Sequence, residues 1–342
     1  TGQYNVALGY GALSASTTGG SNTAVGEQAL NVATTGTQNT ALGKSALAAN
    51  TTASYNTAVG VSALLSNTTG TQNVALGLSS LYTNTTGSNN TAVGLQALHL
   101  STTSDNNTAV GFQALYTNTT GTDNVAVGKE SLKGNTTASN NTALGVTSLY
   151  TNTTGDENTA VGQSSLKANT TGSNNTAVGR TALFANTTGG DNTAVGWDAL
   201  GANTTGANNV AVGYSALGDS NADYNTAVGY EALFNETSTY NTAMGYHALR
   251  SSTSGNNNEA YGHKSLYSLT SGAYNAMVGN HCGWNISVAT HNVGMGRYVF
   301  GSSDGTNMTG GDNTAIGNYA MQKNRSGQRN VAVGYSALFD NT

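Results

Sequence analysis

A five-residue pattern of one polar and several small or apolar positions recurs along the chain: Asn, then Thr or Val, then Ala, then Val or Leu, then Gly. Twenty copies are present, and the first twelve intervals between them are all seventeen residues. The leading residues are Asn5, Asn22, Asn39, Asn56, Asn73, Asn90, Asn107, Asn124, Asn141, Asn158, Asn175, Asn192, Asn209, Asn225, Asn241, Asn258, Asn275, Asn292, Asn313 and Asn330. One copy is too short to bury a core alone, so the period predicts a solenoid in which each copy stacks on the next.

Positions 2 to 4 of the repeat, counted from the leading asparagine, suit a short β-strand whose side chains alternate between two faces. We expect position 4, such as Val25, to fill a small interior. We expect the alanine at position 3, such as Ala24, to make a second, closer contact on the other face. Position 5 is glycine in every copy, which predicts a positive φ or the close approach of another backbone.

The rest of the repeat carries a leucine at position 9 and, in the plainest copies, Asn-Thr-Thr-Gly at positions 12 to 15, as in residues 67–70. This segment predicts a second β-like stretch and a turn. The Ala-Leu portion is too short for a stable helix and predicts at most one turn at a corner. Stacking at about 4.8 Å per copy would align asparagine over asparagine in hydrogen-bonded ladders, and would give a rod on the order of 100 Å long.

The predicted fold class is therefore all-β, a parallel β-solenoid or β-roll with about seventeen residues per turn. Each turn offers only two sizeable apolar residues, at positions 4 and 9, against the entropy of ordering the whole turn. The alanine face would allow chains to approach closely about a common axis. We therefore expect a homotrimeric fibre.

Composition excludes several classes of protein. Charged residues are only 8% of the 342 residues, with a net charge of −5, so disorder driven by charge is not expected. No basic stripe is available for nucleic acid, and no apolar run is long enough to span a membrane. The only cysteine is Cys282, so no disulfide joins two parts of the chain. The sequence begins and ends inside a repeat without an initial methionine, which indicates a window of a longer protein.

The regularity of the repeat divides the chain into residues 1–274, an irregular stretch at 275–312, and resumed repeats at 313–342. Two intervals before the irregular stretch, those starting at Asn209 and Asn225, are one residue short. The interval after Asn292 has twenty-one residues, which predicts a four-residue bulge or loop at 302–305. Such a loop could bind a partner, or could be a local repacking defect.

Candidate chemistry is sparse. His281, Cys282 and His291 lie in the irregular stretch, but their spacing matches no familiar set of metal ligands, so ordinary packing or exposure is expected. No recurring carboxylate pair, Ser-His-Asp order or phosphate-binding glycine loop stands out. We expect no enzyme activity, and no catalytic, cofactor-binding or metal-binding residues.

Aromatic residues recur at two positions of the repeat and are the candidate contacts for a receptor or glycan. Position 6 carries Trp197, Tyr214, Tyr230 and Tyr246, position 10 carries Tyr82, Tyr116 and Tyr150 on alternate turns, and Trp284 is a further candidate. Rings stacked along a fibre can bind sugars, and they can equally cover apolar surface between turns or chains. Both interpretations stay open, although the apolar run at position 6 of the preceding copies favours packing.

The phrase Asn-Thr-Ala-Val-Gly-x-x-Ala-Leu-x-x-Asn-Thr-Thr-Gly resembles the repeats of bacteriophage tail-fibre proteins, including those that end in an intramolecular chaperone domain. Its Asn-x-Ala-Val/Leu-Gly core is similar to the head repeats of trimeric autotransporter adhesins. The resemblance covers about residues 5–274 and again 313–342. It implies a trimeric, left-handed, non-enzymatic β-solenoid at the surface of a virion or a cell.

The function expected from repeat and resemblance together is that of a structural shaft, in a phage tail fibre or a surface adhesin, that extends a host- or receptor-binding tip. The expected partners are further copies of the chain and a host-cell surface receptor or glycan, with neither nucleic acid nor membrane insertion. The alternative is a glycan-binding adhesin or extracellular filament that uses its aromatic ladder. An ice-binding solenoid is less favoured, because adjacent threonines should face opposite sides.

Overall fold

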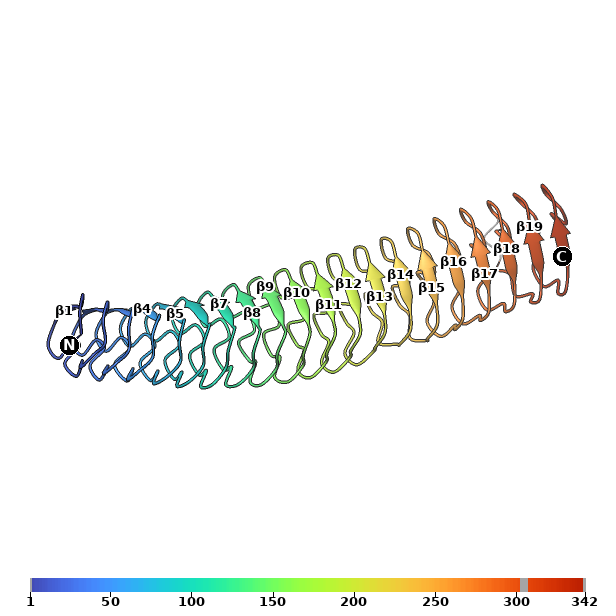
Figure 1. The fold of residues 1–342 in the computed structure, drawn as a ribbon. Coiled ribbons are helices and arrows are strands. Elements are labelled where there is room, and N and C mark those ends of the chain that lie inside the picture. The colour runs from blue at the N-terminus through green and yellow to red at the C-terminus, as the bar shows by residue number, and fades with distance from the viewer. Residues whose placement is uncertain (1, 302–306, 341–342) are drawn as a thin grey trace. The chain divides into compact units, whose positions relative to one another are not determined.

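The computed structural model describes residues 2–301 and 307–340, and the chain divides into two units, Thr1–Asn174 and Asn175–Thr342. Each unit is a parallel β-solenoid with one three-residue strand per turn (Figure 1). The strands of unit 1 are β1 (Val6–Leu8), β2 (Thr23–Val25), β3 (Thr40–Leu42), β4 (Thr57–Val59), β5 (Val74–Leu76), β6 (Thr91–Val93), β7 (Thr108–Val110), β8 (Val125–Val127), β9 (Thr142–Leu144) and β10 (Thr159–Val161). The all-β solenoid predicted from the repeat is confirmed, and the described residues contain no helix.

The second unit repeats the same design. Its strands are β11 (Thr176–Val178), β12 (Thr193–Val195), β13 (Val210–Val212), β14 (Thr226–Val228), β15 (Thr242–Met244), β16 (Glu259–Tyr261), β17 (Ala276–Val278), β18 (Val293–Met295), β19 (Thr314–Ile316) and β20 (Val331–Val333). Consecutive strands within each unit pair in parallel with like position over like position, for example Ala58 with Ala75. The two short turns keep this register, since Ala211 pairs with Ala227 and Ala227 with Ala243.

The interior of each solenoid is filled by the small residues of the repeat, which corrects our expectation for positions 3 and 4. From β2 to β10 and from β11 to β20 the middle residue of every strand, such as Ala24, is buried, whereas position 4 is half-buried or exposed. The leucines at position 9 from Leu30 to Leu266 are fully buried and supply the bulk of the core. Because leucine enters from the opposite side of so narrow a coil, alanine fits opposite it and valine is left on the outer face.

The glycine at position 5 satisfies both conditions that the sequence predicts. Its φ lies between +126° and +146° in all twenty turns. A Cβ at Gly60 would stand 2.6 Å from the carbonyl oxygen of Gly77 in the next turn. Positions 7 and 9 that follow are also left-handed, as at Ser62 (φ 56°) and Leu64 (φ 52°), so the Ala-Leu portion forms a tight turn rather than a helix.

An asparagine column at position 1 runs inside each unit, as the stacking predicts, and a second column at position 12 occurs in runs such as Asn50, Asn67 and Asn84 of unit 1. The Oδ1 atom of Asn56 accepts the backbone N–H of Asn73 at 3.0 Å, and its Nδ2 donates to the carbonyl of Gly70 at 2.9 Å. At position 12, the Nδ2 of Asn67 donates to Oδ1 of Asn50 at 3.1 Å and to Gly70 O at 2.9 Å. These amides are buried, so each bond that they make is worth more than it would be in water.

The Asn-Thr-Thr-Gly segment is a bend, and our expectation of a second β-like stretch there is wrong. The N–H groups of Thr68 and Thr69 both donate to the same carbonyl, that of Thr85, at 2.9 and 3.1 Å. A strand alternates the direction of successive N–H groups, so two neighbours that share one acceptor cannot continue a ladder. The hydroxyl of Thr68 also donates to Thr85 O at 2.9 Å, while Thr69 faces solvent.

The irregular stretch keeps its strands because a larger core side chain in one turn is matched by a smaller one in the next. Met277 takes the alanine position of β17 and is buried, while Gly294 takes it in β18. A Cβ at Gly294 would lie 2.5 Å from Sδ of Met277, so the side chain missing from one turn makes room for the larger one in the other. Phe300 fills the leucine position of the β18 turn and is 1% exposed. The loop predicted at 302–305 lies outside the described residues.

Candidate functional site

The exposed face of the strands forms an uncharged stripe. In unit 1, positions 2 and 4 hold only threonine, valine and leucine. Position 4 is half-buried or exposed in every turn, for example 38% at Val127 and at Leu144. At position 6 a neighbouring apolar run is also exposed, consisting of Val61, Leu78, Leu95 and Phe112. A contiguous apolar surface of this kind on a soluble protein marks an association site more often than a free surface.

Unit 2 carries the predicted aromatic ladder, and the structure brings its four members at position 6 into contact. The rings of Trp197 and Tyr214 meet edge to face at a centroid distance of 5.1 Å. Tyr214 stacks on Tyr230 at 4.9 Å with 7° between the planes, and Tyr230 stacks on Tyr246 at 5.4 Å with 20°. The adjacency predicted from the repeat is therefore present, although no ligand contact follows from it alone.

The column extends beyond the four residues predicted at position 6. Tyr246 stacks on His263 at 5.2 Å, and His263 lies 5.1 Å from His281, where the column passes from position 6 to position 7. From His281 it continues to Tyr298 at 4.9 Å, and on to Tyr319 and Tyr335. The predicted candidate Trp284 joins it from the side, with its ring 4.7 Å from His281. A search for aromatics at two adjacent positions rather than one would have found this continuation.

The geometry of the column decides what it can offer to a ligand. A sugar stacks on the face of an aromatic ring. In the middle of the column the faces of Tyr230 are covered by Tyr214 and Tyr246, so the exposed part is ring edge and hydroxyl. Trp197 stands at the start of the stack and is 51% exposed, with the guanidinium of Arg180 5.7 Å from its ring.

Unit 1 has its own ring contacts at position 10. Tyr82 and Tyr116 do not meet, because His99 lies between them with centroid distances of 5.1 and 5.2 Å. Lys133 lies over the ring of Tyr150 at 5.6 Å, and together they line a shallow depression of about 280 Å³ with Thr117, Gly134 and Thr151. Lys133 also donates a hydrogen bond to Glu130 at 2.8 Å, which lowers the pKa of that carboxyl and raises the pKa of the lysine.

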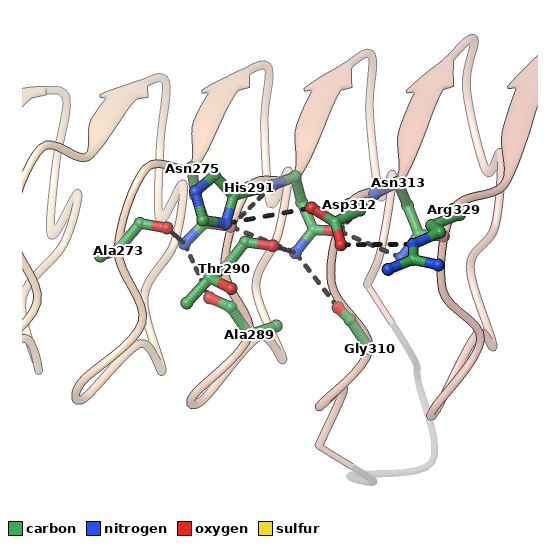
Figure 2. A network of polar contacts seen from close by, with 10 residues as sticks. Ala273, Asn275, Ala289, Thr290, His291, Gly310, Asp312, Asn313 and Arg329 are labelled. Carbon is green, nitrogen blue, oxygen red and sulfur yellow. Dashed lines mark hydrogen bonds and ion pairs between the residues drawn. The ribbon is translucent and has the colours of Figure 1, made fainter.

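The side chains of His281, Cys282 and His291 have three different surroundings. Figure 2 shows His291 in a surface network, in which its Nδ1 is 4.0 Å from Oδ1 of Asp312 and Oδ2 of Asp312 is 4.0 Å from Nε of Arg329. The ring of His291 also stacks on that of Tyr274 at a centroid distance of 5.0 Å. His281 belongs to the aromatic column. Cys282 is buried, and burial raises the pKa of its thiol to about 12, which keeps it protonated and unreactive. Across residues 2–301 and 307–340, no group of three His, Cys, Asp or Glu side chains could hold a metal ion.

A buried carboxyl in unit 2 was not anticipated. Glu236 stands at position 12, which is asparagine in most copies, and is completely buried. Its Oε1 accepts the N–H of Ser238 at 2.6 Å, while Oε2 has no hydrogen bond among the described atoms. Burial raises the pKa of this carboxyl. The signal available in the sequence was an acidic residue at a position that otherwise favours an amide.

The described residues include no helix of the length and hydrophobicity needed to cross a membrane. In comparisons with known proteins, no protein-family model and no curated protein sequence matches this chain.

Proposed function

We propose that this chain is part of the shaft of a structural fibre, in a phage tail fibre or a surface adhesin, that holds a host- or receptor-binding tip away from the virion or cell. The observation that carries the proposal is the in-register stack of turns in each unit, which strand ladders and the buried asparagine column at position 1 hold together. Such a stack transmits tension along its axis through many parallel hydrogen bonds.

The proposed shaft is a homotrimer, and its contact face is the stripe at positions 2 and 4 rather than the alanine face. Alanine at position 3 is buried in the interior of each coil, so it cannot contact another chain. The valines and leucines at position 4 face outward in unit 1. Neither position 2 nor position 4 of that unit carries a charged residue. Covering this stripe with the same stripe of other copies would remove apolar area from water in every turn.

The resemblance to tail-fibre and trimeric adhesin repeats supports the same proposal, including a left-handed coil and a location on a virion or outside a cell. A host-cell receptor or glycan is then the partner of the fibre as a whole. One observation favours a second candidate, glycan binding by the shaft: Trp197 starts the aromatic column half-exposed. The covered faces of Tyr214 and Tyr230 restrict that candidate to the end of the column and to ring edges.

The homotrimer is tested by measuring the native mass of the chain by sedimentation equilibrium. A double variant, Val127→Lys with Leu144→Lys, places two charges on the stripe and is expected to dissociate the assembly to monomers. The matched control, Thr120→Lys with Thr137→Lys, adds the same charges at exposed threonines in the same part of the chain and is expected to leave the mass unchanged. A folded wild-type monomer would refute the proposal.

A further inference from the structure

Three consecutive turns of unit 2 hold two separate columns of stacked tyrosines. In the first, Tyr214, Tyr230 and Tyr246 are exposed by 38%, 42% and 44%. In the second, Tyr224 and Tyr240 stack at a centroid distance of 5.2 Å with 8° between the planes. Tyr224 is 50% exposed and Tyr240 is 56% exposed. The two intervals that are one residue short, 209 to 225 and 225 to 241, separate these turns, so each tyrosine follows its neighbour by sixteen residues.

We propose that these tyrosine pairs are a site of oxidative cross-linking, in which a carbon–carbon bond forms between the ortho carbons of rings on consecutive turns. The co-reactant is a peroxide acting through a one-electron oxidant of the haem peroxidase class. Each phenol loses one electron and its proton, and the two radicals couple at their ortho carbons. The two ring protons at those carbons then return to the phenol oxygens. Overall, two tyrosines and one hydrogen peroxide give one dityrosine and two waters.

The geometry supplies the proximity that this coupling needs. Phenoxyl radicals couple only when two meet, and rings held in contact act at a very high effective concentration. Tyr214 and Tyr230 are held at 4.9 Å with nearly parallel planes, so a small tilt of the exposed rings brings their edges together. The lone thiol, that of Cys282, is buried and so cannot readily repair a surface radical.

Unit 1 provides the contrast within the same chain. Among its described residues, ring contacts join Tyr82 to His99 and His99 to Tyr116, and none joins two tyrosines. The histidine separates the two phenols by an intervening turn. Tyrosine–tyrosine contacts are therefore a property of unit 2 and not of the repeat in general. Within unit 2, Tyr298, Tyr319 and Tyr335 are held further apart, at 5.8 Å, than the pairs of the short turns. Each bond would close a loop of one turn and would restrict the unfolded chain much as a disulfide does.

The test treats the full chain with a haem peroxidase and hydrogen peroxide, then digests it and identifies linked peptides by mass spectrometry. Dityrosine fluorescence should appear, with links 214–230, 230–246 and 224–240 within single chains. Tyr230→Phe preserves the ring stack and should abolish the first two links while leaving 224–240 unchanged. Tyr214→Phe should abolish only 214–230.

Tyr82→Phe is the matched control from unit 1 and should leave all three links at their wild-type yield. The proposal is overturned if links form between tyrosines that are not column neighbours, or if the yield is the same in urea as in the folded chain. It is equally overturned if only different chains become joined, which mixing differently isotope-labelled chains would reveal.

Discussion

The two units form the same kind of coil, but the sequence repeat is more regular in unit 1 than in unit 2. Unit 1 repeats seventeen residues without exception, keeps asparagine, alanine and leucine at positions 1, 3 and 9, and presents an aliphatic stripe. Unit 2 contains shortened turns, a buried glutamate, a methionine–glycine exchange in the core and a long aromatic column. The strand register is the same in both. The backbone ladder and the glycine corner are therefore the fixed parts of the fold, whereas the core tolerates change when neighbouring turns compensate.

The largest expected effect comes from the corner that both units share. Gly60→Ala in unit 1 and Gly229→Ala in unit 2 each put a Cβ within 2.6 Å of a carbonyl oxygen at a φ near +135°. Each should reduce the free energy of unfolding by about 2–4 kcal/mol, measured by urea titration. Gly11→Ala is the control, because Ser62 occupies the equivalent position at φ 56° and the nearest atom would be 3.7 Å away. Unequal losses in the two units would contradict a common corner.

The next effect sharpens the idea of volume exchange. Met277→Ala leaves unfilled space beside Gly294 and should cost about 2–4 kcal/mol of unfolding free energy. The double variant Met277→Ala with Gly294→Ala restores the alanine pair of the regular turns and should recover part of that loss, giving a coupling energy above about 0.5 kcal/mol. Additive effects of the two substitutions would mean that the turns do not compensate each other.

The smallest effect concerns position 12, where unit 1 has Asn118 and unit 2 has Glu236. Because burial raises the pKa of Glu236 in the folded chain, its contribution to stability is fully present below the unfolded pKa of about 4.3 and is lost as pH rises through the folded pKa. Glu236→Gln should therefore stabilise unit 2 at pH 7 by about 1–2 kcal/mol and have little effect near pH 4. Thermal melts at the two pH values measure the difference, and an equal effect at both would exclude a buried titration.

Much of this fold follows from the repeat, and the parts that do not have identifiable causes. The strand at positions 2 to 4, the glycine corner and the asparagine ladders follow from spacing and residue type. The direction of the strand faces did not, because alternation defines two faces without saying which is inside. Ala24 and Val25 are both apolar, and only the position of Leu30 across the coil decides between them.

The candidate site was predictable to a similar extent. Seventeen- and sixteen-residue spacings place Tyr214, Tyr230 and Tyr246 in one column, as the structure confirms. The passage of the column to His281 was missed because it requires a change of position within the repeat, from one side chain to its neighbour. The covering of ring faces was also missed, since it depends on side-chain rotamers that a sequence pattern does not specify.

Electron cryo-microscopy of the native assembly would resolve both the stack of turns and the number of chains in cross-section. We expect three coils in register, a rise of about 4.8 Å per turn along each, and the side chains of Val127 and Leu144 packed between chains. A single unpartnered coil, or an assembly whose chains meet through the exposed threonines at Thr120 and Thr137, would contradict this expectation.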